Sequence, residues 1–280
     1  MELSKNKKII YLIFGIIFVL LLSYKLPTFA RFKNRVSSYS NVWSGNVASK
    51  YKSGNGTSKD PYIISNGEEL AYFSSQLENN NYEGVYFKLS NDILLNEGLF
   101  KYEDNFVKYI VDNTIYYVNG NEYYDNSDFL GEAVGRINIF PSLSNFKGFL
   151  DGDYHTIYGY FSENSLFDNL NGEVSSLYIE NSFINGNGNL GILANKVVDG
   201  SVNNVLVDGY IVSDNFELSV DDMSILSDYN NLEYNVLGGI AAYSNNSTFI
   251  NCVSKANIYG GFLTGGIIGY SEDLSIINSY

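Results

Sequence analysis

Short stretches of alternating hydrophobic and polar residues, separated by glycine and asparagine, make up most of the chain. The stretches "YII" at 62–64, "GVYFKLSNDILLN" at 84–96 and "FKGFLDGDYHTIYGYF" at 146–161 have the two-residue period, or the short apolar run, that is typical of β-strands. The 25 tyrosines and 18 phenylalanines also favour strands over helices. The pattern predicts an all-β protein.

One segment, directly after the first strand, has a helical pattern instead. Ser65 and Glu68 are spaced as in a capping box, in which a hydroxyl and a carboxylate satisfy the first free amides of a helix. Four residues then share one helical face: Leu70, Phe73, Ser74 and Leu77. We expect a helix over 66–78 that caps the N-terminal end of the strands.

An insertion rich in Tyr and Asn interrupts the strand pattern at about 97–145. Within it, Asn119 and Gly120 lie between two strand-like runs, which is a strong hairpin signal. The sequence therefore predicts a hairpin insertion.

The chain repeats itself from Leu166 onward. Three units contain a glycine followed thirteen residues later by an asparagine: Gly191 and Asn204, Gly238 and Asn251, Gly265 and Asn278. The second and third units begin 27 residues apart. The first and second begin 47 residues apart, because a polar loop is inserted between them at about 213–235. Equal offsets across unequal periods indicate aligned structural repeats.

Such a unit cannot bury its apolar residues alone, so each is expected to stack on the next at about 4.8 Å with parallel strand pairing. The asparagines then form a ladder at one bend, and the glycines permit a positive φ or a close backbone approach. In the first repeat, Ser176 stands where the ladder asparagine would fall. Four isoleucines are expected to point inward: Ile240, Ile250, Ile267 and Ile277.

The N-terminus has the pattern of an export signal. Lysines precede an uncharged apolar run from Ile9 to Tyr24, which as a helix would span roughly 24 Å, somewhat short of a hydrocarbon core of about 30 Å. Two interpretations stay open: a signal-anchor helix that is retained in the membrane, and a signal peptide cleaved after Ala30. The first predicts a single-pass membrane protein with an extracellular repeat domain, and the second a secreted protein.

These patterns divide the chain into three regions. A signal anchor or signal peptide occupies 1–30, and a polar stalk and lead-in segment occupies 31–60. The repeat domain occupies 61–280, with the insertions at about 97–145 and 213–235.

Charge and composition narrow the classes of partner. A net charge of −14 argues against nucleic acid, because neutralising phosphates needs clustered Lys and Arg. Cys252 and His155 are the only cysteine and histidine, which excludes an intrachain disulfide and a zinc site built from Cys and His. No metal and no cofactor is expected.

Catalytic chemistry has one candidate cluster, at "LDGDYH". Asp151 and Asp153, with His155 beside them, could act as the grouped carboxylates of a polysaccharide lyase or hydrolase. The favoured interpretation is structural: Asp151 accepts turn amides and Gly152 supplies the bend.

Three further features were weighed as sites. An acidic loop could hold Ca²⁺ but lacks the order of a dedicated calcium loop, so a solvated loop is favoured; it contains Asp214, Glu217, Asp221, Asp222, Asp228 and Glu233. Cys252 is expected to be a small packed residue. Four hairpin tyrosines could form a sugar-stacking platform, although cross-strand packing is the commoner role: Tyr116, Tyr117, Tyr123 and Tyr124.

The repeated phrases "LGGI" and "TGGIIG", followed by "FINC" or "IINS", resemble the GLUG-motif repeats of bacterial surface proteins. Trp43 and the phrases "GNGTSKDPYIIS", "EELAYFS" and "FKGFLDGDYHTI" resemble the region that precedes such repeats. The resemblance covers about 43–280. It implies a right-handed parallel β-helix outside the cell, and such repeats also accompany secreted immunoglobulin-cleaving metallopeptidases without being catalysts.

Two functions follow as hypotheses. The preferred one is a non-catalytic surface module, adhesive or a spacer, that presents its loops to host or cell-surface glycans or proteins. The alternative is a carbohydrate-active β-helix enzyme. Because a bare last repeat exposes unpaired backbone, a partner at the C-terminal end, or further repeats beyond Tyr280, is also expected.

Overall fold

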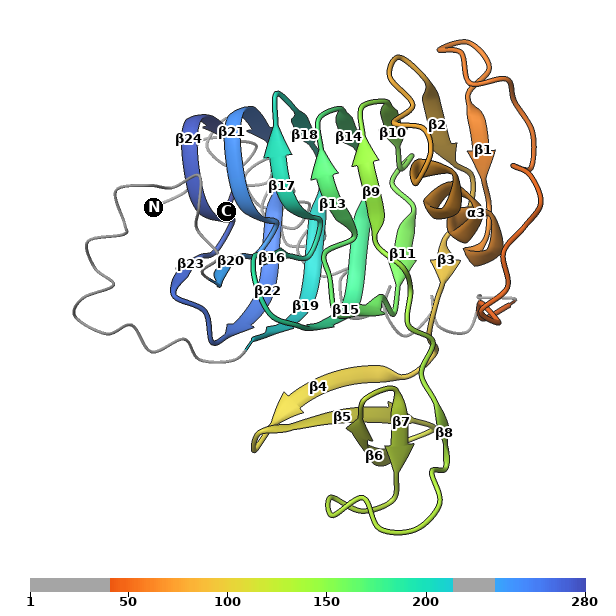
Figure 1. The fold of residues 1–280 in the computed structure, drawn as a ribbon, viewed down its shortest axis with the longest axis vertical. Helices are drawn as coiled ribbons and strands as arrows, with labels where there is room; N and C mark the ends of the chain where they lie inside the picture. Colours follow the sequence, from red (N-terminus) through yellow and green to blue (C-terminus); the bar gives the residue numbers. More distant parts are fainter. Residues whose placement is uncertain (1–40, 214–234) are drawn as a thin grey trace, which may run out of the picture. The chain divides into compact units, whose positions relative to one another are not determined.

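Strands from successive repeats lie side by side and in parallel, as Figure 1 shows for the stack from β1 to β24. The computed structural model describes residues 41–213 and 235–280. In these ranges the chain is mostly β, and its one α-helix is α3 (Gly67–Leu77). The expected all-β class with parallel pairing is therefore confirmed for the described residues.

The main sheet, called the long sheet below, collects two strands from most repeats. It contains β1 (Tyr62–Ile64), β2 (Tyr86–Leu89), β9 (Leu143–Phe146), β10 (Phe149–Asp151), β13 (Phe167–Leu170), β14 (Glu173–Ser175), β17 (Ala194–Val198), β18 (Ser201–Asn203), β21 (Ala241–Ile250) and β24 (Ile268–Ile277). The first half of β21 pairs with β17 and the second half with β18, and β24 pairs with both halves. Two rows of strands thus join at β21.

Two smaller parallel sheets complete the stack. One contains β3 (Ile93–Leu94), β11 (Thr156–Tyr158), β12 (Phe161–Ser162), β15 (Tyr178–Asn185), β19 (Leu206–Val212) and β22 (Val253–Tyr259). The other contains β16 (Leu190–Gly191), β20 (Val236–Gly238) and β23 (Leu263–Gly265). Successive repeats contribute their strands in the same order, and the three-stranded sheet takes its strands from the last three repeats of the described residues. Equivalent residues of successive repeats are therefore neighbours.

The core is a column of apolar side chains that follows this register. Phe87, Leu150, Val174, Val202 and Phe249 occupy equivalent positions on adjacent strands, and each is at most 1% exposed. Because side chains alternate between the two faces of a strand, the residues on either side of each one point outward. Burial of this continuous column is what single repeats could not achieve alone.

The expectation for the inward isoleucines is only half right. Ile240 is fully buried and Ile267 packs against the core, as predicted. Ile250 faces outward instead, because Phe249 takes the inward position on β21. Ile277 is the direct partner of Ile250 on β24 and therefore faces outward as well. A one-residue error reverses every side chain of a strand.

The predicted asparagine ladder is present. The Asn251 side-chain amide donates to the Asn204 side-chain oxygen at 3.0 Å, and the Asn278 amide donates to that of Asn251 at 3.4 Å. All three have a left-handed φ, between +51° and +53°, and so has Ser176 at +52° in the equivalent position of the first repeat. Asparagine is one of the few residues that adopts this conformation readily.

The repeated glycines are required for close approach and not for φ. Gly191, Gly238 and Gly265 align across β16, β20 and β23. A Cβ at Gly238 would collide with the carbonyl oxygen of Ala241. Any side chain here would force the backbone apart, so of the two roles that the sequence left open, the structure selects close approach.

The helix α3 covers the end of the stack that holds β1 and β2 (Figure 1). Its expected apolar face is confirmed, and Phe73 packs on the rings of Phe87 and Phe146 at 4.5 and 5.4 Å. The cap was predicted one residue too early. Asn66 is the N-cap and accepts from the Glu69 amide, while the Glu69 carboxylate accepts from the amide and hydroxyl of Ser65.

The insertion folds as an antiparallel sheet, called the insertion sheet below. It contains β4 (Leu99–Glu103), β5 (Phe106–Val111), β6 (Thr114–Asn119), β7 (Glu122–Tyr124) and β8 (Gly135–Arg136). The hairpin predicted at Asn119 and Gly120 is confirmed, with Gly120 at φ +60°. Two further two-residue hairpins turn at Asp104-Asn105 and Asp112-Asn113, where all four residues have positive φ, as turns of the I′ type require.

Asn181 attaches the insertion sheet to the stack. It lies in β15 at φ +55°, accepts from the Phe100 amide and donates to the Gly98 carbonyl, both at 2.8 Å. Phe100 then packs against Phe161 and Phe183 in a second apolar cluster. The insertion is therefore docked by a buried side chain and not only tethered by its two ends.

The expected membrane localisation is corrected. Among residues 41–213 and 235–280, no helix is long and apolar enough to cross a bilayer. The apolar run at 9–24, from which the anchor and the signal peptide were predicted, lies outside the described residues, as do the acidic residues of the loop at 214–234. Residues 41–60, expected to be a stalk, belong to the same unit as the sheets, and Trp43 is only 6% exposed.

Candidate functional site

The outer face of the long sheet is the place where chemistry-bearing side chains gather. Because Phe87, Leu150 and Val174 point inward, their neighbours in β2, β10 and β14 point outward. Outward positions on these strands hold Tyr86, Lys88, Phe149, Asp151, Glu173 and Ser175. Parallel register alone therefore brings an aromatic pair, charged groups and a hydroxyl together from segments up to 89 residues apart.

Tyr86 and Phe149 form a stacked pair on this face. Their ring centroids are 4.4 Å apart and their planes differ by 10°. The backbone register explains the stack, since the two residues are direct partners on adjacent parallel strands. Both rings are only partly buried, so the pair presents aromatic surface to the outside of the stack.

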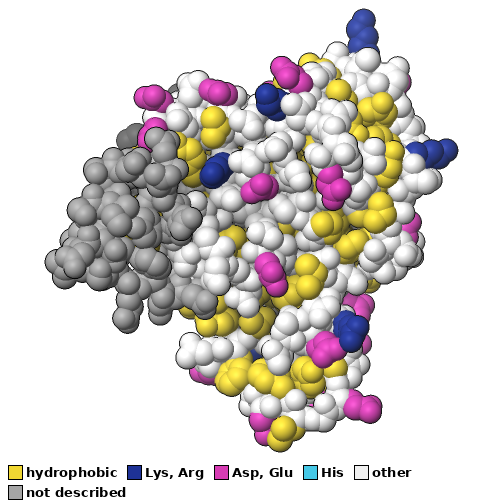
Figure 2. Space-filling view, viewed as in Figure 1, with side chains coloured by type: hydrophobic (Ala, Val, Ile, Leu, Met, Phe, Trp, Pro, Cys, Tyr) yellow, Lys and Arg dark blue, Asp and Glu magenta, His cyan; other side chains and the backbone are white. Residues whose placement is uncertain are grey.

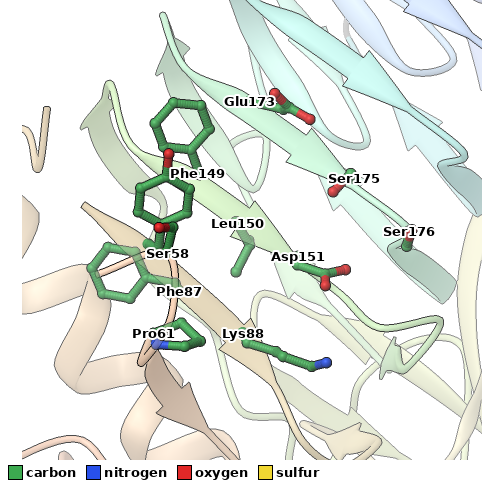
Figure 3. A pocket seen from close by; sticks show the side chains of 11 residues that line it. Ser58, Pro61, Phe87, Lys88, Phe149, Leu150, Asp151, Glu173, Ser175 and Ser176 are labelled. Atoms are coloured by element: carbon green, nitrogen blue, oxygen red, sulfur yellow. The ribbon is translucent and has the colours of Figure 1, made fainter. Parts of the chain in front are cut away.

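A groove of about 540 Å³ runs beside this pair (Figure 3). Its lining residues are Ser58, Pro61, Tyr86, Phe87, Lys88, Phe149, Leu150, Asp151, Glu173, Ser175 and Ser176. In Figure 3, Asp151 lies between Lys88 and Ser175, as the register of β2, β10 and β14 requires. The groove is large enough for a small molecule or for part of a polymer chain.

The charges in the groove are unequal. Lys88 forms an ion pair with Asp153 at 3.0 Å, and both side chains are partly exposed, at 36% and 47%. Asp151 and Glu173 line the same groove, so the group of four residues holds one positive and three negative charges. Because the Lys88 charge is already matched by Asp153, the groove presents an excess of carboxylate oxygens, which accept hydrogen bonds.

The cluster predicted at "LDGDYH" is divided between two roles. Asp151 lines the groove, and its Oδ1 accepts from the Asp153 amide at 2.9 Å, as the structural interpretation required. The bend itself is formed by Asp153 and Tyr154 at φ +48° and +61°, and not by Gly152, which lies too close to the Ser176 carbonyl to be any other residue.

His155 does not join the two aspartates. Its Nδ1 lies 3.2 Å from Asp92 Oδ1, which also accepts from the Thr156 amide at 2.8 Å. Asp92 follows β2 in the neighbouring repeat, so this contact ties two repeats together. The sequence could not pair these two residues because 63 positions separate them.

The hairpin tyrosines are divided between the two faces of the insertion sheet. Tyr123 contacts the rings of Tyr109 and Tyr116, at centroid distances of 5.3 and 5.0 Å, on the face that packs against the second cluster. Tyr117 and Tyr124 lie on the other face beside Phe106 and Phe129. In Figure 2, hydrophobic side chains of this sheet gather at the bottom of the view. Cross-strand packing accounts for all four, and they form no single platform.

Two further expectations concern single groups. Cys252 is fully buried, with its sulfur 3.3 Å from the Val202 carbonyl oxygen, and burial raises the pKa of its thiol. It is therefore a packed residue. In the described part of the chain, no group of three or more His, Cys, Asp or Glu side chains is placed to hold a metal ion.

Four groove residues were missed at the level of sequence: Tyr86, Lys88, Phe149 and Glu173. One feature of the sequence could have indicated them. Tyr86 and Phe149 are aromatic at an outward position where the later repeats have Ser201, Thr248 and Ser275. Only an alignment of β2 and β10 with these repeats would make that contrast visible, and the insertion separates β2 from β10 and from the later repeats.

Comparisons with known proteins add little to this geometry. No family model and no curated protein matches the chain. A solved structure of a proposed immunoglobulin A1 protease from Bacteroides ovatus is similar at 17% identity and a TM-score of 0.36, over 82% of this chain and 77% of that one. A similarity this low supports no conclusion about fold or activity.

Proposed function

We propose that this chain is a non-catalytic, adhesive glycan-binding module whose repeats form a right-handed parallel β-helix of the GLUG type. Parallel pairing of equivalent strands, the column of inward apolar residues and the Asn204–Asn251–Asn278 ladder support the β-helix part of the proposal. The GLUG assignment depends on the repeated phrases of the sequence.

The single observation that supports binding is the stacked Tyr86–Phe149 pair inside a groove lined by carboxylates and hydroxyls. The apolar C–H face of a sugar packs on an aromatic ring, while its hydroxyls need hydrogen-bond partners beside that ring. Asp151, Glu173 and Ser175 are such partners, and they project to the same side of the sheet as the rings. A peptide of apolar character would leave these carboxylates without partners.

The non-catalytic assignment is favoured by how the charged groups are engaged. One oxygen of Asp151 accepts the Asp153 amide, and Lys88 is paired with Asp153. Both groups therefore have structural partners that a general acid or a charge-stabilising cation would have to give up during a reaction.

A glycan array probed with the purified full-length chain tests the proposal. We expect binding to at least one glycan class, and a loss of about tenfold or more in the Phe149→Ala variant, since one aromatic stack contributes about 0.5–1.5 kcal/mol beyond the buried area. Tyr117→Ala, which removes a ring from the insertion sheet, is the matched control and should bind normally. If the Phe149→Ala variant binds as well as the parent protein, the groove is not the binding site. If the parent protein binds no glycan, the chain is a spacer and not an adhesive module.

A carbohydrate-active enzyme is the second candidate, and one observation favours it. Asp151 pairs with Ser175, two residues after Glu173, so the two carboxylates are diagonal neighbours on adjacent strands. Strand spacing and rise place diagonal neighbours about 8 Å apart, within the separation of about 6.5–9.5 Å used by inverting glycosidases. New reducing ends from a polysaccharide, abolished by Glu173→Gln with folding intact, would establish this alternative.

A further inference from the structure

The groove is continuous with a row of outward side chains that crosses the long sheet. Six residues are in direct register on successive strands and are called the outer column here: Tyr86, Phe149, Glu173, Ser201, Thr248 and Ser275. The column changes character along its length. It begins with two rings, continues with one carboxylate and ends with three hydroxyls.

We propose that the groove binds an uncharged linear glycan that lies along the outer column and crosses several strands. This inference rests on the proposed function, and it specifies the ligand class and the direction of the bound chain. A single terminal sugar, or a polyanion, is excluded by it.

The first step concerns the part of the Phe149 ring that Tyr86 does not cover. Tyr86 stacks on one face of that ring, on the side of β2. The other face is directed toward β14, where Glu173 is the direct partner of Phe149. Strands are about 4.8 Å apart, which is close to the 4.4 Å of the existing stack. The Glu173 carboxylate therefore lies one strand beyond the two rings, where it can accept hydrogen bonds from the hydroxyls of a sugar that packs on the exposed part of the Phe149 ring.

The second step concerns the space beyond Glu173. Ser201 and Thr248 are partly buried and Ser275 is exposed, and none of the three is large enough to close the column. The Asn203 amide donates to the Ser201 hydroxyl oxygen at 2.8 Å, so the Ser201 hydrogen is directed elsewhere and can be donated. A chain that leaves the groove in this direction meets hydroxyl groups at every strand.

The third step concerns charge. Two carboxylates, Asp151 and Glu173, and one lysine line the groove, and Asp153 already pairs with that lysine; the whole chain has a net charge of −14. On the face drawn in Figure 2, Lys and Arg side chains stand apart from one another. A uronate or sulfated polymer would be repelled, because its negative charges and those of the carboxylates would lie within the screening length of about 8 Å in physiological salt. Sugar hydroxyls, in contrast, can donate to Asp151 and Glu173.

Calorimetric titration of the full-length chain with neutral oligosaccharides from disaccharide to hexasaccharide, and with an oligogalacturonate, tests the proposal. Neutral cello-, manno- and xylo-oligosaccharides serve as probes. We expect affinity to rise about tenfold or more with length in at least one neutral series, and the oligogalacturonate to bind more weakly than that series. Thr248→Trp should remove the gain with length, because it blocks the column beyond the groove.

Asn257→Trp is the matched control, since it places the same side chain on an outward strand position of the other large sheet. It should leave the whole series unchanged. This inference is overturned if the oligogalacturonate binds more tightly than the neutral oligosaccharides, or if affinity does not depend on their length. In either case, weaker glycan binding by the Phe149→Ala variant would still support a glycan site in the groove. If none of these probes binds, this inference fails, and the glycan array decides separately whether the proposed function fails with it.

Discussion

The side-chain amide of Asn251 donates to the side-chain oxygen of Asn204 across 47 positions of sequence, at a distance of 3.0 Å. The backbone supports the same contact, because the Asn204 amide donates to the Ile250 carbonyl at 2.8 Å. Both residues have a left-handed φ of +53°. The ladder therefore combines a conformational requirement with a contact between repeats, and the two can be separated by mutation.

Asn251→Ala is expected to lower the free energy of unfolding by about 1–2 kcal/mol, since alanine is strained at this φ and cannot make the ladder bond. Asn251→Gly should cost less, because glycine removes the bond but accepts the φ. Urea unfolding of both variants measures the difference. Equal stabilities of the two variants would show that backbone strain has no part in the preference for asparagine.

Phe249→Ala should destabilise the protein by about 3–5 kcal/mol, because the ring is fully buried in the apolar column. Ile250→Ala, the adjacent outward residue, should cost less than about 1 kcal/mol. The same unfolding experiment compares them. A larger loss at Ile250 would mean that the strand faces the opposite way from the structure.

Gly238→Ala is expected to cost about 3 kcal/mol, because the new methyl group collides with the Ala241 carbonyl and the backbone of β24 would have to move. Gly266→Ala is the control, since nothing lies within 4 Å of a Cβ built there. Thermal unfolding monitored by circular dichroism distinguishes the two. A tolerated Gly238→Ala would refute the close approach assigned to the repeated glycines.

Stability should fall as pH rises above about 10, and Tyr109 contributes to this fall. Burial raises the pKa of Tyr109 to about 12, so in the folded state it keeps its proton where the unfolded state, with a pKa near 10, begins to lose it. The contribution is fully present below pH 10 and is lost as pH rises through 12. Tyr109→Phe, measured by urea unfolding between pH 8 and pH 11, should show a shallower decline than the parent protein.

Cys252 should not react with thiol reagents in the folded protein. The side chain is fully exposed only on unfolding, and burial raises its pKa, so the reactive thiolate is scarce. Reaction with an aromatic disulfide reagent should be complete in urea and slow in buffer. Rapid labelling of the native chain would contradict the packing around Val202.

Much of the repeat architecture could be predicted from sequence because it depends on the spacing of residues within each repeat. The thirteen-residue offset between glycine and asparagine predicted the ladder, and Asn119-Gly120 predicted a hairpin. Errors arose where neighbouring residues compete for one role. Ile250 was preferred to Phe249 as the inward residue, and Ser65 to Asn66 as the N-cap, since each pair offers two chemically acceptable choices.

The candidate site was far less predictable. Asp151 was singled out by its turn motif, but Tyr86, Phe149 and Glu173 come from segments that the insertion and a change of repeat separate. Nothing in their local sequence distinguishes an outward aromatic residue from an inward one. Their proximity arises only when parallel pairing places β2, β10 and β14 next to one another.

By itself, then, the sequence determined that this protein is β-rich, that its C-terminal half repeats, and which glycines and asparagines mark each repeat. Those features depend on residue chemistry and on spacing within one coil. Tertiary structure alone decided which face of each strand is buried, how the insertion sheet docks through Asn181 and Phe100, and that Tyr86 stacks on Phe149. These outcomes depend on register between distant strands, which is set by the packing of the whole stack.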